Sequence, residues 1–372
     1  MKKYKIWLSP PFLSGSEYKH IQEAILSNWI TTMGQSLNQF ENELSKKFNP
    51  KKVCCLNSGT SAIHLALKLL NVQENDEVIC PSLTFVATAN PILYEKARPI
   101  FVDSEPETWN ISPYWLEVAI KDRIKKGKKP KAILVVHLYG NSAKMDEIQE
   151  ISNHFNIPII EDNAESFGAT YNGQALGTFG KLGVLSFNGN KIITTSAGGA
   201  LIGETEYYEK AKYLAHQAKS QVPYYHHEEL GYNYGMSNLL AAIGLAQLEK
   251  FDERIQAKRS IFEHYKNQLS QFIGLDFPKE LKNSFSTRWL SVFLLPNHKN
   301  PSDLIEKFSE LEIETRRIWK PLHLQPIFEN APFYGEHLCT DLFERGICLP
   351  SGVGLSIENQ QEIIENLEKF LN

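Results

Sequence analysis

The chain lacks the features that mark membrane, repeat and nucleic-acid-binding proteins. It has no run of roughly 18 or more apolar residues, so we expect no membrane-spanning helix. No low-complexity tract or internal repeat is apparent. Acidic and basic residues nearly balance, 43 against 39, for a formal net charge of −4. This balance gives no reason to expect nucleic acid or an anionic membrane as the main partner.

Cysteine is scarce and carries no disulfide or metal signature. The five cysteines are odd in number, lack CxxC spacing and lie mostly in apolar runs: Cys54, Cys55, Cys80, Cys339 and Cys348. This pattern predicts buried, reduced thiols, and we expect no metal site. The first residues, MKKYKIWLSPPF, contain no apolar segment of the secretory kind. We therefore expect a soluble, cytoplasmic protein.

Most of the chain alternates short β-branched runs with helical patterns, as where VCCLNSG leads into TSAIHLALKLL. This alternation predicts an α/β fold with a mainly parallel sheet covered on both faces. From about Met236 one long helical pattern runs toward Leu269 and leads into a smaller α+β region. We predict a large domain over residues 1–250 and a small C-terminal domain over 251–372.

Ligands of such sheets bind outside the C-terminal ends of the strands. Two charged residues lie at such positions. Lys191 follows the strand pattern GVLSF, and a partly buried lysine of lowered pKa forms Schiff bases. Asp162 ends IPIIED and could keep a pyridine nitrogen protonated. Taken singly, a solvated lysine and a helix-capping aspartate are the ordinary alternatives.

Small polar residues suggest a phosphate site. Gly59, Thr60 and Ser61 form a turn that opens a helix, where free N–H groups favour anions. Ser186, five residues before Lys191, could donate a hydroxyl to the same phosphate. Ordinary Ser/Thr capping is the alternative. Phe85 could stack on a ring or belong to the core.

The order of these signals along the chain is more specific than any one of them. A phosphate turn, a stacking aromatic, a strand-end Asp and Ser-x-x-x-x-Lys before a Gly pair form the layout of aspartate-aminotransferase-type enzymes. The chain resembles the DegT/DnrJ/EryC1/StrS sugar aminotransferases nearly end to end. The resemblance includes NSGTSAIHLAL, PSLTFVATANP, IIEDNAESFGATYNGQALGTFG, SFNGNKIITTSAGGAL and IETRRIWKPLH. NGNKIITTSAGG and LPSG resemble most the enzymes that aminate a UDP-linked 4-keto-6-deoxy sugar in bacillosamine synthesis.

The resemblance implies fold type I, with pyridoxal 5′-phosphate (PLP) as the cofactor. Lys191 would form the Schiff-base link, Asp162 would pair with the pyridinium nitrogen, and Phe85 would stack on the ring. Thr60, Ser186 and the backbone N–H groups of Gly59–Ser61 would hold the phosphate.

Further roles follow from the same resemblance. Asn188 would lie beside the cofactor, and Glu165 would face its 3′ oxygen. A carboxylate would repel that oxygen, so we hypothesise that Glu165 is protonated or donates through water. Asn233 would reach the phosphate of a neighbouring subunit, which implies a homodimer with shared active sites. Gly235 and Arg317 depart from the Arg and Pro that many relatives carry there.

The implied reaction moves an amino group from glutamate to a nucleotide-linked keto sugar for bacterial surface glycans. The foremost acceptor is UDP-2-acetamido-2,6-dideoxy-hexos-4-ulose. Candidate substrate residues are Trp29, His227, Arg316 and His323, for which core or surface roles are the alternatives.

Other functions remain open at this point. Within the family, the acceptor could be the GDP-linked precursor of perosamine, or the amine could enter at C3. A non-catalytic PLP-binding relative is a further alternative. A nicotinamide oxidoreductase is disfavoured because GTFGKLG (177–183) has the wrong glycine spacing.

Overall fold

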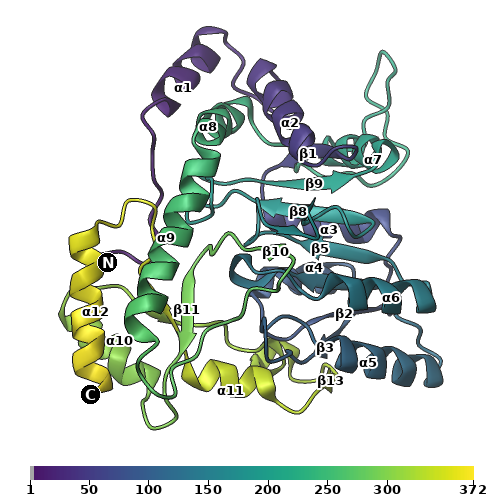
Figure 1. Cartoon of the computed structure of the whole chain (residues 1–372). Helices are drawn as coiled ribbons and strands as arrows, with labels where there is room; N and C mark the ends of the chain where they lie inside the picture. Colours follow the sequence, from purple (N-terminus) through teal and green to yellow (C-terminus); the bar gives the residue numbers. More distant parts are fainter. Residues whose placement is uncertain (1–3) are drawn as a thin grey trace.

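A computed structural model describes residues 4–372. Its centre is a sheet of eight strands (Figure 1). In spatial order they are β1 (Lys52–Leu56), β9 (Gly199–Gly203), β8 (Leu182–Ser186), β5 (Ile159–Asp162), β4 (Ala132–Val136), β2 (Glu77–Pro81), β3 (Arg98–Val102) and β13 (Phe333–Tyr334). Pairing is parallel from β8 to β13, and β9 is antiparallel to both of its neighbours, β1 and β8. The predicted α/β class is confirmed.

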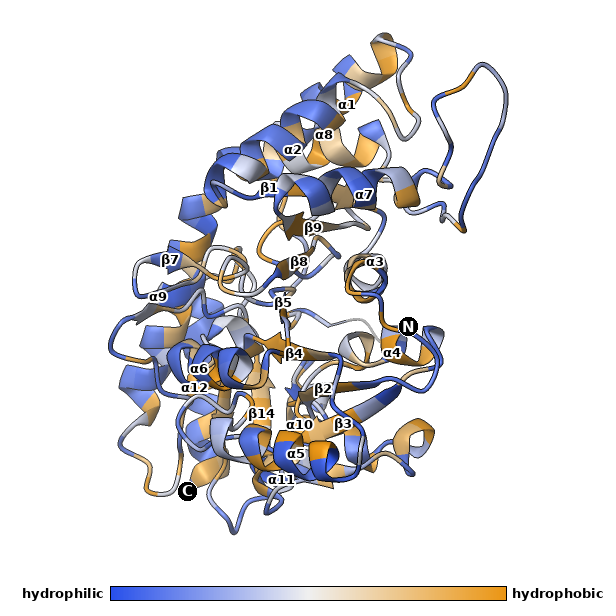
Figure 2. Cartoon of the chain, turned by 90° about the vertical axis from the view of Figure 1, so that its right-hand side faces the viewer, coloured by the Kyte–Doolittle hydropathy of each residue, from blue (hydrophilic) through white to orange (hydrophobic). Residues whose placement is uncertain are grey.

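Helices cover the sheet on both faces. Those before residue 250 are α1 (Glu17–Leu26), α2 (Gln35–Lys47), α3 (Gly59–Leu69), α4 (Asn90–Tyr94), α5 (Pro113–Lys125), α6 (Met145–Phe155), α7 (Thr205–Ala215) and α8 (Asn238–Glu249). Val78 and Cys80 join a core with α3, α4 and α7, whereas Ile79 joins a core with α5 and α6. Successive residues of a strand point to opposite faces, so both faces are buried. Figure 2 shows these strands as largely hydrophobic beneath mixed helices.

The C-terminal region has its own small sheet. Its strands, in spatial order, are β11 (Ser291–Leu294), β14 (Gly346–Leu349) and β12 (Arg316–Arg317). Its helices are α9 (Phe251–Leu269), α10 (Pro301–Glu310), α11 (Leu338–Arg345) and α12 (Ile357–Leu371). A third sheet joins β10 (Ser284–Phe285), β6 (Thr170–Tyr171) and β7 (Gln174–Ala175), and so links this region to the large sheet's connections.

The long helix predicted from about Met236 is wrong in one respect, because it is two helices. The backbone leaves helical geometry at Lys250, where φ is −115°. The break has a physical reason, since the two helices pack against different elements. α8 packs against α1 and α2, whereas α9 packs against α12 and β11.

Two segments cross the predicted division at residue 250. β13 comes from the C-terminal region but pairs with β3 of the large sheet. Near the N-terminus, Ile6 pairs with Ile313, and the Leu8 N–H donates to Glu314 Oε2 over 3.0 Å. The boundary between domains therefore stays a prediction.

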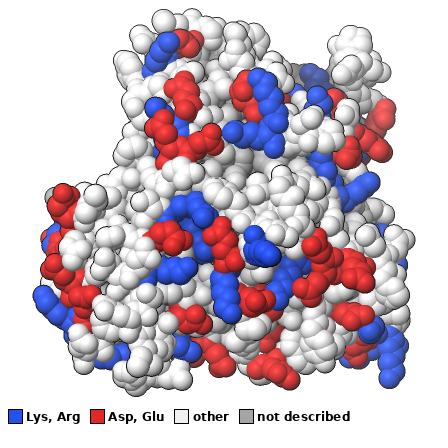
Figure 3. All heavy atoms as spheres, viewed as in Figure 1, with Lys and Arg blue, Asp and Glu red and all other residues white. Residues whose placement is uncertain are grey.

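The remaining expectations about composition agree with the structure. All five cysteines are buried, and none forms a disulfide. On the face shown in Figure 3, acidic and basic side chains intermingle. Over residues 4–372, no helix combines the length and apolar character needed to cross a membrane.

Close backbone contact holds the start of α3 on the sheet. A Cβ at Gly199 of β9 would lie 2.3 Å from the Gly59 nitrogen and 2.4 Å from the Ser58 carbonyl carbon. A Cβ at Gly59 would in turn lie 3.1 Å from Ser186 Cβ. Glycine at these positions lets the first turn of α3 lie directly against the ends of β8 and β9.

This contact yields a stability prediction. We expect Gly199→Ala to destabilise the protein by about 1–3 kcal/mol, because the added methyl meets backbone atoms that cannot rotate away. Urea unfolding measures the change. Gly189→Ala is the matched control, since its Cβ would meet nothing closer than Pro11 Cγ at 3.8 Å. Equal stability of the two variants would contradict the packing argument.

Candidate active site

A cavity of about 370 Å³ opens at the C-terminal edge of the large sheet. Val136, Asp162 and Ser186 line it from the ends of β4, β5 and β8. Other lining residues come from the start of α3, the segment 84–88, the loop 188–198 and the C-terminal region. From the C-terminal region these are Trp289, Arg316 and Trp319. The cavity is therefore where parallel α/β sheets place their ligands.

Lys191 lies in the loop between β8 and β9, part-buried at the cavity wall. Its Nζ is 3.9 Å from the centre of the Trp289 ring, a cation–π contact. Trp289 is held in turn, because its Nε1–H donates to the Asn190 carbonyl over 2.7 Å. Burial lowers the pKa of Lys191, while the carboxylates of Glu165 and Asp162 oppose the shift. A lysine in this setting is an activated amine.

Asp162 is buried at the end of β5 and held on both oxygens. Oδ2 accepts from Thr88 Oγ1 over 2.9 Å, and Oδ1 accepts from the Ala164 N–H over 3.1 Å. Thr84 Oγ1 lies 2.9 Å from Thr88 Oγ1 and extends this series of hydrogen bonds. Burial raises the pKa of Asp162, and the two hydrogen bonds act against that shift. The carboxylate thus has one fixed orientation at the cavity.

The first turn of α3 offers an anion site. Ser58 caps the helix, because its Oγ accepts from the Ser61 N–H over 3.0 Å. In the part of the chain that the structure describes, the N–H groups of Gly59 and Thr60 have no acceptor. Ser186 lies next to this turn, and it lines the cavity with Thr60. Two free N–H groups, the helix dipole and two hydroxyls suit a phosphate.

The comparison with known proteins decides between the families that such a site allows. The model of the DegT/DnrJ/EryC1/StrS aminotransferase family matches residues 12–368. The chain belongs to this family.

Relatives of known name extend this result. The chain is 50% identical over 98% of its length to EpsN of Bacillus subtilis (strain 168), named as a pyridoxal phosphate-dependent aminotransferase and covered to 95%. It is 38% identical to a GDP-perosamine synthase of Escherichia coli O157:H7, with 97% of each chain covered. It is 36% identical to the UDP-4-amino-4,6-dideoxy-N-acetyl-β-L-altrosamine transaminase of Campylobacter jejuni, with 80% of this chain and 79% of that one covered.

A solved structure agrees in fold. The sugar aminotransferase Spr1654 from Streptococcus pneumoniae, in its PLP-form, superposes with a TM-score of 0.89 at 26% identity. The match covers 98% of each chain. The protein is therefore a PLP-dependent sugar aminotransferase of fold type I.

The residues of this DegT/DnrJ/EryC1/StrS aminotransferase fit PLP, which supplies an electron-accepting ring for amino-group transfer. PLP needs an anion site for its phosphate, a carboxylate for its ring nitrogen and an amine for its aldehyde. The turn at Gly59 and Thr60, Asp162 and Lys191 present these three groups to one cavity. Phe85 lines the same cavity and is 49% exposed, so its ring is free to meet a planar ligand.

Glu165 is buried and lines the cavity together with Asp162, Lys191 and Trp319. Its Oε2 accepts from the Tyr139 N–H over 2.7 Å, and its Oε1 accepts from Trp319 Nε1 over 3.0 Å. The Trp319 N–H donates to Tyr139 Oη over 3.0 Å, which ties the three residues together. Burial raises the pKa of Glu165 to about 7, against the opposing charge of Lys191. The group is thus poised between its two protonation states near neutral pH.

Most of the residues predicted from sequence meet in this cavity. They are Gly59, Thr60, Phe85, Asp162, Glu165, Ser186, Asn188, Lys191 and Arg316. Ser61 does not line it, because its N–H is bound by Ser58 and its hydroxyl donates to Asn57 Oδ1 over 2.6 Å.

Four other predicted residues lie outside the cavity of their own chain. Trp29 and His227 are exposed, and the carbonyl of Gln217 lies 2.8 Å from His227 Nδ1. Asn233 is also exposed, while its carbonyl accepts from Asn57 Nδ2 over 3.2 Å at the cavity's edge. His323 Nδ1 lies 2.7 Å from Ser82 Oγ, and its ring stacks on Phe333. Their binding roles stay predictions.

The structure also reveals site residues that sequence reasoning missed: Thr88, Asn190, Trp289 and Trp319. Thr88 lies within the PSLTFVATANP segment, but nothing in its spacing marks it as the partner of Asp162. Trp289 and Trp319 belong to the C-terminal region, 98 and 128 residues beyond Lys191. Only docking of that region on the large sheet brings them to the cavity.

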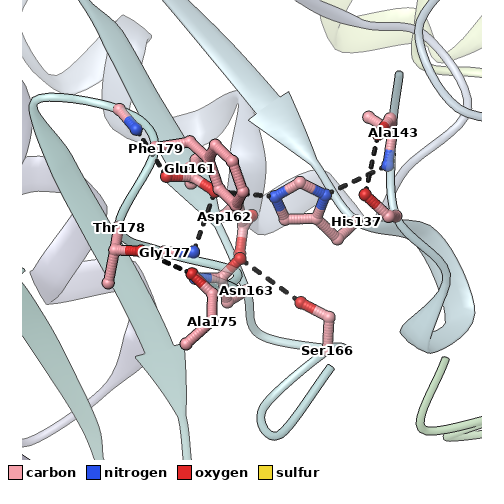
Figure 4. Close-up of polar contacts among 12 residues, drawn as sticks. His137, Ala143, Glu161, Asp162, Asn163, Ser166, Ala175, Gly177, Thr178 and Phe179 are labelled. Carbon is pink, nitrogen blue, oxygen red and sulfur yellow. Dashed lines mark hydrogen bonds and ion pairs between the residues drawn. The ribbon is translucent and has the colours of Figure 1, made fainter. Parts of the chain in front are cut away.

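His137, at the end of β4, has a structural role (Figure 4). Its Nδ1 accepts from the Ala143 N–H over 3.2 Å, so Nε2 carries the hydrogen and donates to Glu161 over 3.0 Å. Glu161 also accepts from the N–H groups of Gly177 and Gly180. This fully buried network orders the turn before β8, and it leaves His137 no free nitrogen for chemistry.

The raised pKa of Glu165 gives a pH prediction. Between the ordinary value of 4.5 and about 7, the folded protein holds this proton more tightly than the unfolded chain. The contribution of Glu165 to stability therefore falls as pH rises through this window. Glutamine does not titrate, so Glu165→Gln should not suffer this loss. From about pH 5 to about pH 8, the free energy of unfolding of the variant should therefore rise by about 2 kcal/mol relative to that of wild type.

Urea unfolding of the cofactor-free protein at the two pH values measures the gain. Glu147→Gln, at an exposed position on α6, is the control and should follow wild type. A constant difference between Glu165→Gln and wild type at both pH values would show that the carboxyl does not titrate in this window.

Proposed function

We propose that the protein transfers an amino group from glutamate to a nucleotide-linked 4-keto-6-deoxy sugar. The foremost acceptor is UDP-2-acetamido-2,6-dideoxy-hexos-4-ulose, and the product serves bacterial surface glycan synthesis. The observation that carries the proposal is the amine of Lys191, which faces a cavity shared with Asp162, Glu165 and a phosphate-type turn.

Each residue has a role in this reaction. Lys191 Nζ holds the cofactor and, when released, takes the proton from the donor's Cα as a general base. In the second half-reaction the same amine delivers a proton to the carbon that carried the sugar's keto oxygen. Asp162, fixed by Thr88, keeps the ring nitrogen protonated, and Phe85 stacks on the ring. Thr60, Ser186 and the first N–H groups of α3 hold the phosphate, with Asn188 beside the cofactor.

The proposal for the acceptor rests on the reactions that the names of the relatives state. One acts in GDP-perosamine synthesis and another on a UDP-linked amino sugar, so both nucleotides occur among proteins more than a third identical to this one. Arg316 is the candidate for the diphosphate, since it lines the cavity from the C-terminal side. The GDP-linked precursor of perosamine is the second candidate acceptor.

The proposed assembly is a homodimer with shared active sites. Exposed apolar side chains concentrate on α1 and the residues after it, and on the loop between α7 and α8. They are Tyr18, Ile25, Leu26, Trp29, Ile30, Met33, Val222, Tyr224, Tyr225 and Leu230. Both segments project from one end of the molecule (Figures 1 and 2). Exposed apolar side chains gathered at one end of a molecule are a feature of interfaces, and they support this assembly. Asn233, His227 and Trp29 belong to these segments and would complete the partner's site.

Complementation tests the shared sites. Lys191→Ala and Asn233→Ala should each be inactive alone, whereas a mixture of the two after subunit exchange should regain up to about a quarter of wild-type activity. Half of the dimers are then mixed, and each mixed dimer has one site with both residues intact. No recovery in a mixture that exchanges subunits would place Asn233 in its own chain's site.

Lys191 is the residue on which the chemistry depends. We expect Lys191→Ala to lose at least about 10²–10⁴-fold in turnover and the visible absorbance of the cofactor–lysine link. Lys191→Arg should be equally inactive, because a guanidinium stays protonated and cannot act as the base. Circular dichroism checks that both variants fold. Substantial turnover by Lys191→Arg would contradict the assigned role.

The first experiment is a titration of the holoenzyme followed by visible absorbance. Glutamate should abolish the absorbance of the cofactor–lysine link, and the UDP-linked 4-keto sugar should restore it. Restoration by the GDP-linked sugar instead would select the second candidate. Absorbance that no amino donor changes would support a non-catalytic PLP-binding protein and overturn the proposed function.

A further inference from the structure

The two half-reactions bring anions into one cavity. The amino donor carries two carboxylates, and the acceptor carries a diphosphate. Among the described residues that line this cavity, Lys191 and Arg316 are the only lysine or arginine side chains. Lys191 is committed to the cofactor and to proton transfer. Arg316 is therefore the one cation of this chain's lining that remains for the anionic groups of either substrate.

Arg316 forms an ion pair with Glu314. Its Nε and Nη2 donate to Glu314 Oε1 over 3.0 and 2.6 Å. Glu314 is itself anchored, because its Oε2 accepts from the Leu8 N–H over 3.0 Å. The side chain of Glu314 is 11% exposed, but that of Arg316 is 68% exposed. The pair thus has a fixed anion and an accessible cation, and ion pairs with such an exposed member are easily exchanged.

Space for that exchange exists on either side of Arg316. A second hollow of about 260 Å³ adjoins the cavity, and both are lined by Asn190, Arg316 and Trp319. The second hollow also contains Glu314. Arg316 lines both spaces and its side chain is 68% exposed, which leaves the guanidinium room to turn away from Glu314.

We propose that Arg316 binds a carboxylate of the amino donor, which takes the place of Glu314. Glu314 is then a built-in competitor that neutralises Arg316 between half-reactions. Because the acceptor's diphosphate needs the same cation, one arginine serves both half-reactions in turn. This inference rests on the proposed function for its donor, a dicarboxylic amino acid.

Binding of glutarate, a dicarboxylate with no amino group, tests the inference without chemistry. Calorimetry on the holoenzyme gives its affinity. We expect Arg316→Gln to bind glutarate about 10- to 100-fold more weakly than wild type, as for loss of a hydrogen bond to a charged group. The glutamate concentration that half-saturates the loss of visible absorbance should rise by a similar factor. Unchanged affinity for glutarate in Arg316→Gln would overturn the inference.

Glu314→Gln tests the competition and guards against misfolding of the first variant. Removing the competing charge should tighten glutarate binding about two- to fivefold. Weaker binding in Glu314→Gln would mean that Glu314 only orients Arg316, and exchange would be excluded. Arg317→Gln is the matched control on the same strand, since its guanidinium bonds to Asn300 and Ser302. It should bind glutarate as wild type does.

The outcomes separate this inference from the proposed function. If glutamate changes the absorbance of the wild-type holoenzyme but Arg316→Gln behaves as wild type, only the role of Arg316 fails. If glutamate leaves the wild-type absorbance unchanged, the donor itself is wrong, and the proposed function fails first.

Discussion

The site depends on one constraint, the common edge at which parallel strands end. β4, β5 and β8 run in the same direction, so their last residues, Val136, Asp162 and Ser186, meet at one rim. β9 runs antiparallel and returns the chain across that edge, which places the loop with Lys191 beside Asp162. The glycines at 59 and 199 then let α3 lie against the same strands. Carboxylate, amine and anion site are thereby assembled by the sheet.

Burial shifts the pKa values of the charged groups in the cavity. Desolvation lowers the pKa of Lys191 and raises those of Asp162 and Glu165, so each is moved toward its neutral form. The protein counters part of this cost with fixed hydrogen bonds to the carboxylates, from Thr88 and from Trp319. An amine that can lose its proton is suited to act as a general base.

The C-terminal region completes the wall of the cavity. Trp289 meets Lys191, Trp319 binds Glu165, and Arg316 adds the cation. The N-terminal segment takes part as well, since Leu8 anchors Glu314, the partner of Arg316. Residues more than 300 positions apart in the chain thus control the charge available to an incoming anion.

The sequence by itself determined the fold class and the family and led to the proposed cofactor residues, because these depend on local patterns and on their order along the chain. Strand patterns predicted β1, β5 and β8, and Lys191, Asp162 and the turn at Gly59 were selected because they follow or end such patterns. Only the tertiary structure decided the rest. The long helical segment is divided at Lys250, and the Ser61 N–H donates to the cap of α3. His137 belongs to a buried network with Glu161. The tertiary structure also brought Trp289 and Trp319 to Lys191 and Glu165. Such contacts arise from packing between distant segments, and no spacing within one segment encodes them.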